Sequence, residues 1–168
     1  MNLIIYYGGI IFDYLSKLNV GLIEYIAVSK EYRKKGIATK ILNYMVYILN
    51  KESKKKKLKR IKFICGEVEK DFGKKQEKHY FWDKYGFKKL EFKYIQPALD
   101  ENKKNVEIMT FGIMTKIPNA EFEKKTISSS LLKEILYEYY GKDEKAKAVL
   151  DYMSKEIDNK GSLINLIN

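Results

Sequence analysis

Residues 25–38 read YIAVSKEYRKKGIA, an apolar, β-rich run that gives way to a basic turn with one glycine. After the turn, apolar side chains recur at helical spacing, at Ile37, Ala38, Ile41, Leu42, Met45, Ile48 and Leu49. This spacing predicts an amphipathic helix whose N-terminus directly follows the turn. Because unpaired N–H groups and the positive end of the helix dipole meet there, the turn is suited to hold an anion such as a pyrophosphate.

The side chains of the turn support the same interpretation. Gly36 lets the backbone approach a phosphate closely, and Ala38 keeps the first helical turn uncrowded. Arg33, Lys34 and Lys35 add cationic donors. The pattern Arg-x-x-Gly-x-Ala resembles the acyl-CoA-binding motif Gln/Arg-x-x-Gly-x-Gly/Ala of the GNAT superfamily of acyl-CoA-dependent N-acyltransferases.

Three neighbouring sequence features occur in the same order along the chain as in that superfamily. A strand ending in Ile-Ala-Val precedes the turn, and a second strand, at residues 60–68, follows the helix. Residues 81–87 read FWDKYGF and resemble the later signature Phe-Tyr-x-x-x-Gly-Phe. The resemblance covers residues 2–117 and implies a GNAT-like α/β fold, in which helices flank a mixed, mostly antiparallel sheet.

Alternation and turn residues predict the remaining elements of this part. Gly8 and Gly9 separate two β-rich runs, at residues 3–7 and 10–14, which predicts a two-residue hairpin. Further strands are expected at residues 20–28, 60–68, 88–95 and 106–117, and a short second helix is expected at residues 75–85, closed by Gly86.

Beyond Pro118 the pattern becomes helical. A serine run at residues 128–130 precedes apolar positions at helical spacing, and Gly141 ends that helix. Asp143 and Glu144 open another helix. We therefore expect residues 1–117 to form the acyl-CoA-binding domain and residues 118–168 to form a C-terminal helical hairpin, packed on the same domain or used for dimerisation.

The sequence departs from the GNAT pattern at its start. GNAT domains normally begin with a strand and two helices that wall one side of the acceptor groove, and these elements are missing here. Either the recorded start lies downstream of the true one, or the C-terminal helices or a second subunit supply the wall. A homodimer is thus one of the expected assemblies.

Composition narrows the class of protein. The 168 residues, 45% of them hydrophobic, suit one domain with a substantial core. No run reaches the length of a membrane span, and the N-terminus lacks a basic leader, so no membrane association is expected. One cysteine, Cys65, favours the cytoplasm and a buried structural thiol. The net charge of +11 comes from lysine, with arginine only at Arg33 and Arg60, which argues against nucleic acid as the partner.

The resemblance implies a reaction and its ligands. The protein is expected to move an acetyl group from acetyl-CoA to a primary amine, on a small molecule or a protein, by direct attack and without a metal. The strand backbone at Ile26, Ala27 and Val28 would pair with the pantetheine amides. The pyrophosphate would be held by Arg33 and by the backbone of Lys34, Lys35, Gly36, Ile37, Ala38 and Thr39.

An acceptor amine must lose a proton, so a carboxylate is expected near the central strands. Glu24 is the first candidate, since it interrupts an apolar strand four residues before Val28, where GNAT sequences often carry a glutamate. Glu67 and Glu69, which share one strand face, are the alternatives. For all three, a solvent-facing strand position is the competing interpretation.

The usual GNAT proton donor is a tyrosine after the phenylalanine of the later signature, and Trp82 occupies that position. Tyr85 lies three residues on, hence on the same helix face, and is the candidate substitute. A packed core tyrosine is the alternative role for Tyr85, and a thiolate could also depart unaided. His79 is interpreted as a surface or capping residue.

Two other functions compete with an N-acetyltransferase. Trp82 and the missing N-terminal elements favour a non-catalytic acyl-CoA-binding module of GNAT type. A basic RNA-associated protein is the third hypothesis, and only the net charge supports it.

Overall fold

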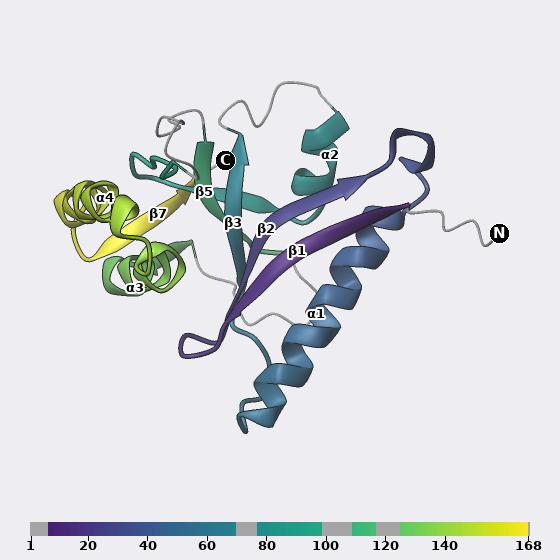
Figure 1. Ribbon diagram of the computed structural model, residues 1–168, viewed down its shortest axis with the longest axis horizontal. Helices are drawn as coiled ribbons and strands as arrows, with labels where there is room; N and C mark the ends of the chain where they lie inside the picture. The colour runs from purple at the N-terminus through teal and green to yellow at the C-terminus, as the bar shows by residue number, and fades with distance from the viewer. Residues whose placement is uncertain (1–6, 70–76, 99–108, 117–124, 168) are drawn as a thin grey trace.

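The computed structural model describes residues 7–69, 77–98, 109–116 and 125–167 (Figure 1). In chain order its elements are β1 (Gly8–Leu15), β2 (Val20–Val28), the 3₁₀ turn η1 (Lys30–Tyr32), α1 (Ile37–Lys55), β3 (Ile64–Glu69), α2 (Glu77–Lys84), β4 (Phe87–Leu90), β5 (Met109–Met114), β6 (Thr126–Ser128), α3 (Ser129–Tyr140), the 3₁₀ turn η2 (Glu144–Ala146), α4 (Lys147–Asn159) and β7 (Leu163–Ile167). None of the described helices combines the length and hydrophobicity that crossing a bilayer requires.

The strands form one sheet in the order β1-β2-β3-β5-β4-β7-β6. Strands β2 and β3 run parallel, and every other neighbouring pair is antiparallel. The prediction of a mixed, mostly antiparallel sheet flanked by helices is therefore confirmed.

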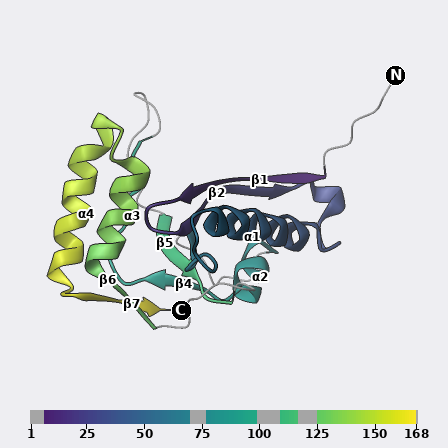
Figure 2. The ribbon, with the colours of Figure 1, turned by 90° about the horizontal axis from the view of Figure 1, so that it is seen from below.

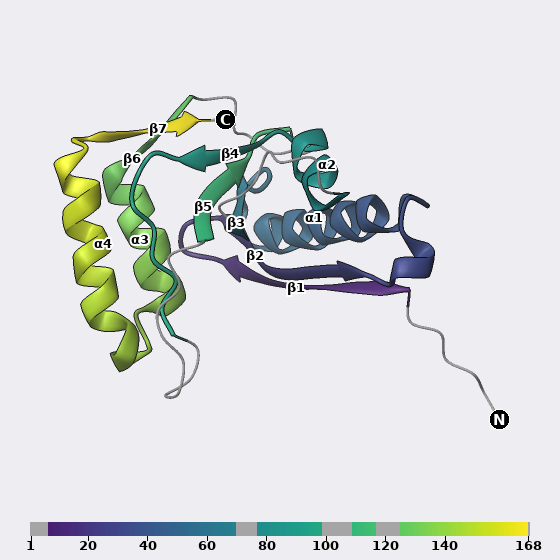
Figure 3. The same ribbon diagram turned by 90° about the horizontal axis from the view of Figure 1, so that it is seen from above.

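Helices cover the two faces of this sheet (Figure 2). Helix α1 packs on one face, where Leu42, Met45 and Leu49 are fully buried, as the apolar repeat predicted. Burying each such side chain contributes roughly 1.5–3 kcal/mol. Helices α3 and α4 pack on the opposite face, as the view from above also shows (Figure 3).

Strand β3 supplies side chains to both faces by period-two alternation. Ile64 and Val68 point into the hydrophobic cluster between the sheet and α1, which we call the α1 core. Cys65 points into the cluster between the sheet and helices α3 and α4, which we call the α3/α4 core. Cys65 is 1% exposed, which confirms the buried thiol, and burial raises its pKa.

The expected hairpin at Gly8 and Gly9 is wrong. Both glycines lie within β1 and pair with Val28 and Ala27 of β2, and the turn follows Leu15 instead. A Cβ on Gly8 would lie 2.5 Å from the Ala27 carbonyl oxygen. The glycine is there because two strands approach closely, and not because the chain reverses.

The turn that joins β1 to β2 lies at residues 16–19 and contains Asn19 at φ 58°. Asparagine tolerates this left-handed conformation better than most residues. The Asn19 amide donates to the Arg60 carbonyl at 2.8 Å and accepts from the Tyr14 hydroxyl at 2.9 Å. These bonds tie the turn to the segment that enters β3.

The C-terminal part contains more than two helices. The Ser128 hydroxyl caps α3 by accepting from the Leu131 N–H at 3.3 Å, and α3 ends before Gly141, as predicted. The sequence interpretation missed β6 and β7, which pair with each other, while β7 also pairs with β4. Short strands of three and five residues carry too little alternation to be recognised.

Several predicted boundaries shift. Strand β3 begins at Ile64 rather than at residue 60, and β4 ends at Leu90 rather than at residue 95. The predicted strand at residues 3–7 and the polar connection at residues 100–105 lie almost entirely outside the described residues.

Candidate active site

The central strands part at one end, and this opens the candidate site. Strands β2 and β3 pair only over Gly21–Ile23 and Ile64–Gly66, and beyond these residues they diverge (Figure 1). A Cβ on Gly66 would lie 2.8 Å from the Ile23 carbonyl oxygen, so a glycine permits the last close contact. The β2 backbone after Ile23 has no pairing partner in β3, which leaves peptide groups available to a ligand.

A β-bulge lies at the point of divergence. Ile11 faces Tyr25 and Phe12 faces Ile23, so Glu24 is the extra residue of β2. A bulge changes the alternation of the strand and redirects a side chain. Here Ile23 and Ile26 both pack in the α1 core, and Glu24 lies on the opposite side of the sheet with Asp13 and Glu67 as charged neighbours.

The basic turn lies beyond the same end of β2. Gly36 is the N-cap of α1 at φ 74°, a left-handed conformation that L side chains rarely adopt. It has no side chain to accept from the first-turn N–H groups, and the first turn of α1 contains no acidic residue. The first-turn N–H groups of α1 therefore face neither a capping side chain nor an acidic residue of that turn, and the anion site stays a prediction.

Side chains hold this turn against β2. The Arg33 Nε donates to the Val28 carbonyl at 3.2 Å, and the Lys35 ammonium lies 5.0 Å from the centre of the Tyr32 ring. The Lys84 ammonium at the end of α2 donates to the Thr39 hydroxyl at 3.3 Å. Lys84 therefore adds a cation beside the first turn of α1, which the sequence interpretation missed because 45 residues separate the two side chains.

Glu24 is exposed, and its pKa is raised by partial burial, by the charge of Asp13 and by a hydrogen bond with Asp13. In β1, Asp13 pairs with Leu22, close to the bulge. A carboxylate with a raised pKa is a stronger proton acceptor than an ordinary glutamate.

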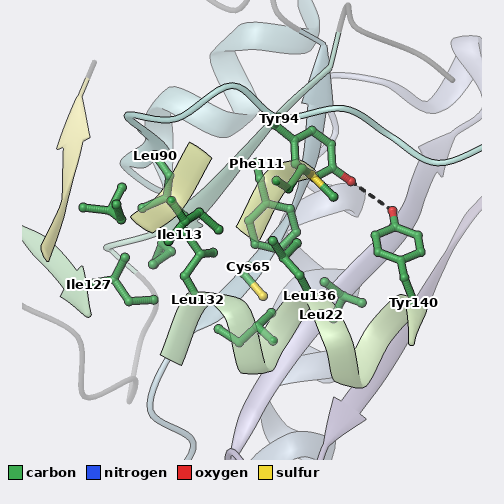
Figure 4. Close-up of a cluster of buried hydrophobic side chains, with 14 of the residues drawn as sticks. Leu22, Cys65, Leu90, Tyr94, Phe111, Ile113, Ile127, Leu132, Leu136 and Tyr140 are labelled. Carbon is green, nitrogen blue, oxygen red and sulfur yellow. Dashed lines mark hydrogen bonds between the residues drawn. The ribbon is translucent and has the colours of Figure 1, made fainter. Parts of the chain in front are cut away.

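Glu67 is half-buried and heavily hydrogen-bonded. Its Oε1 accepts from the hydroxyls of Tyr94 and Tyr140, and its Oε2 accepts from the Gln96 amide at 2.6 Å. The two tyrosine hydroxyl oxygens lie 3.0 Å apart (Figure 4). Burial is the largest cause of the raised pKa of Glu67, the bonds from Tyr140 and Gln96 oppose it, and the charge of Glu24 adds to it.

Comparison with known proteins identifies the family. The family model described as an acetyltransferase (GNAT) domain matches residues 2–89, more than half of the chain. The chain belongs to the GNAT acetyltransferase family. The matched residues include the bulge, the basic turn, α1 and the later aromatic signature.

Solved acetyltransferase structures resemble this GNAT protein at low identity. Ard1 from Thermoplasma volcanium is 17% identical, with a TM-score of 0.43, over 64% of this chain and 63% of its own. Nourseothricin acetyltransferase is 13% identical, with a TM-score of 0.44, over 64% and 58%. A GNAT-family protein from Bacteroides thetaiotaomicron is 21% identical, with a TM-score of 0.46, over 67% and 56%. The alignments thus span less than two thirds of each relative, and a search of curated proteins found no match.

The aromatic signature of this GNAT domain packs around the end of α2. Tyr85 is 5% exposed, and its ring centre lies 5.1 Å from that of Phe81. Trp82, at the position of the usual GNAT tyrosine, is half-buried with its ring centre 5.7 Å from that of Phe87. All four residues belong to or border the α1 core. His79 lies in α2, and Glu69 ends β3, but their side chains lie outside the described structure.

The residues that the sequence interpretation brought together for catalysis divide between the faces of the sheet. Tyr85 lies on the α1 face, whereas Glu24 and Glu67 lie on the α3/α4 face. The residues that it missed are Tyr94, Gln96 and Tyr140, which reach Glu67 from 27, 29 and 73 positions away in the chain. Residues so distant leave no local pattern.

Proposed function

We propose that this GNAT protein is an N-acetyltransferase that moves an acetyl group from acetyl-CoA to a primary amine by direct attack. The observation that carries the proposal is the position of the basic turn, with Gly36 at φ 74° as the N-cap of α1, next to the diverging end of β2. An anion site and an unpaired strand edge lie side by side, as a ligand with a pyrophosphate and an amide-bearing arm requires.

The residues proposed to bind acetyl-CoA are those of the sequence interpretation. The backbone of Ile26, Ala27 and Val28 follows the bulge and pairs with pantetheine amides. The N–H groups from Lys34 to Thr39, that is Lys34, Lys35, Gly36, Ile37, Ala38 and Thr39, hold the pyrophosphate. Arg33 contributes charge, and its bond to the Val28 carbonyl keeps the turn next to the strand.

Glu24 is the proposed proton acceptor for the amine. It is exposed beside the opening between β2 and β3, and its raised pKa makes it a better proton acceptor than an ordinary glutamate. Tyr85 is the proposed proton donor to the departing thiolate. We propose that residues 118–168 form an extension packed on the acyl-CoA-binding domain of residues 1–117, and that the protein acts in the cytoplasm.

A non-catalytic acyl-CoA-binding module is the second candidate. The observation in its favour is Trp82, since an indole cannot supply the proton that the usual tyrosine would give. Such a module would keep the anion site and lose turnover.

Two measurements on one sample separate these functions. Thiol release from acetyl-CoA is followed over a panel of diamines, amino sugars and lysine-containing peptides, and thermal unfolding is followed with and without CoA. Turnover together with CoA-dependent stabilisation supports the transferase. Stabilisation without turnover on any amine supports the binding module, and absence of both contradicts the acyl-CoA assignment.

A further inference from the structure

The strongest unexplained feature outside the family motif is the network in which three polar side chains bond to Glu67. It joins β3 to the segment after β4, through Tyr94 and Gln96, and to the last turn of α3, through Tyr140. Tyr94 and Tyr140 are 4% and 8% exposed, so their hydroxyls are placed inside the protein. Buried polar groups are costly unless they are paired, and here the hydroxyls of Tyr94 and Tyr140 are paired with a carboxylate.

The network surrounds a carboxylate at a chemically significant position. Glu67 is the first β3 residue after the last β2–β3 pair, Ile23 with Gly66. Its side chain lies on the same sheet face as Glu24, close enough for the two charges to interact. Glu67 therefore lies at the inner end of the opening where an acceptor amine would enter.

The hydrogen bonds favour the ionised form of Glu67, which is the form that can accept a proton. Both tyrosine hydroxyls donate to Oε1 and Gln96 donates to Oε2, so three donors stabilise the carboxylate. Each tyrosine has one hydroxyl proton, and both are then used on Glu67. No hydroxyl proton then lies between the two tyrosine oxygens, although these oxygens are 3.0 Å apart. When Glu67 takes up a proton, a hydroxyl can rotate and donate to the other tyrosine oxygen.

Each described element around Glu67 contributes a polar or charged side chain that faces it. These side chains are Glu24 from β2, Tyr94 and Gln96 from the segment after β4, and Tyr140 from α3. The Tyr139 ring of α3 lies with its centre 4.2 Å from that of Tyr140, and Tyr139 interacts with the charges of Glu67, Glu24 and Asp13. Tyr139 is thus close enough to interact with both the exposed carboxylate of the bulge and the buried network.

We propose that Glu67 is a second proton acceptor of the acyl-transfer site, with Tyr94, Tyr140 and Gln96 as positioning residues, so that α3 belongs to the reaction site. The inference rests on the proposed acetyl transfer to an amine. A cationic amine loses one proton before attack and a second as the C–N bond forms and the C–S bond breaks. The sulfur takes up one of these protons, so one leaves the site per turnover. Glu67 holds that proton until water removes it.

The test compares pH profiles of kcat/KM for the amine in the full chain. Glu67→Gln should lower the plateau by at least about 10-fold and leave the affinity for CoA unchanged. Tyr140→Phe should move the acidic limb to higher pH by about one unit. The reason is that the variant removes a charge-assisted bond to the ionised form of Glu67, and such a bond is about twice as strong as a neutral hydrogen bond.

Tyr137→Phe is the matched control on the same helix. Tyr137 is 42% exposed and donates to Asp151 at 3.0 Å, away from Glu67, so its profile should match that of the parent. If Tyr140→Phe does not fold, Gln96→Leu tests the same direction of shift from a segment outside the helices.

The outcomes distinguish the role of Glu67 from the proposed acetyl transfer. An active parent with an unchanged profile in Glu67→Gln overturns the role of Glu67 and leaves the proposed transferase standing. A fall in turnover in Tyr140→Phe without movement of the limb reduces Tyr140 to a packing role and overturns its positioning function. A parent that is stabilised by CoA but acylates no amine overturns the transferase, and the role of Glu67 with it.

Discussion

The two faces of the sheet differ in how their function is encoded. On the α1 face, the proposed anion site draws on residues close together in the chain, because Arg33, Gly36 and Thr39 belong to one turn and one helix end. On the α3/α4 face, the Glu67 network is built from residues of three separate segments. A ligand held by backbone groups thus leaves a short motif in the sequence, whereas a carboxylate held by distant side chains is recognised only in the folded chain.

The largest expected effect is on the proposed anion site at the start of α1. Gly36→Glu should weaken acetyl-CoA binding by about 10³-fold, because the new carboxylate repels the pyrophosphate and at least two charge-assisted bonds of about 1.5–3 kcal/mol no longer form. Calorimetric titration with CoA measures the change.

Gly161→Glu is the matched control for Gly36→Glu. Gly161 also has a positive φ, at 93°, and open space at its Cβ, but it lies between α4 and β7. Unchanged affinity in a folded Gly36→Glu protein would contradict the anion site.

The next largest effect is a loss of turnover on substitution of Glu24 in the β2 bulge. Glu24→Gln should lower turnover by about 10² at neutral pH, with partial recovery as the pH rises and free amine accumulates. Because the pKa of Glu24 is raised, the parent should lose activity on acidification at a higher pH than an ordinary glutamate would give. Glu134→Gln, at an exposed position of α3, is the control. A profile equal in height and shape to the parent would assign the base to another carboxylate.

A smaller effect is expected for Tyr85 on the α1 face. Tyr85→Phe should reduce turnover roughly 10-fold without lowering the melting temperature if the hydroxyl protonates the thiolate. A packing role would give the reverse, with unchanged turnover and a loss of about 1 kcal/mol in the free energy of unfolding. Tyr44→Phe, at a position that is 66% exposed, should change neither quantity.

The smallest effect tests an interaction that crosses between helices. Lys84→Gln should weaken CoA binding by about 3-fold, since an exposed ion pair between Lys84 and the pyrophosphate contributes about 0.2–1 kcal/mol. The difference should shrink at high salt because screening shortens the reach of the charge. Lys142→Gln, an exposed lysine after α3, should bind CoA as the parent does. Equal affinity of Lys84→Gln and the parent at low salt would place Lys84 outside the site.

Much of the fold was predictable because the signals were local. The apolar repeat after Gly36 indicated α1, the β-rich run indicated β2 at residues 20–28, and the serine run indicated the start of α3. The hairpin at Gly8 was misread because glycine marks both a turn and a close strand contact, and the sequence alone does not distinguish them.

The candidate site was predictable only in part. Glu24 and the basic turn were predicted from a short stretch of sequence, but the bulge at Glu24 depends on the register between two strands. Register is a property of paired backbones, so no composition or spacing within β2 reveals it. Placing α3 opposite α1 required the sheet itself.

The sequence separations within the Glu67 network have a consequence for refolding. Contacts between distant residues form late, because long loops must close before they contribute. The basic turn joins β2 to α1, whereas Tyr140 must find Glu67 across 73 positions. During refolding from denaturant, CoA binding should therefore return before full enzymatic turnover, and the lag between them would time the docking of α3.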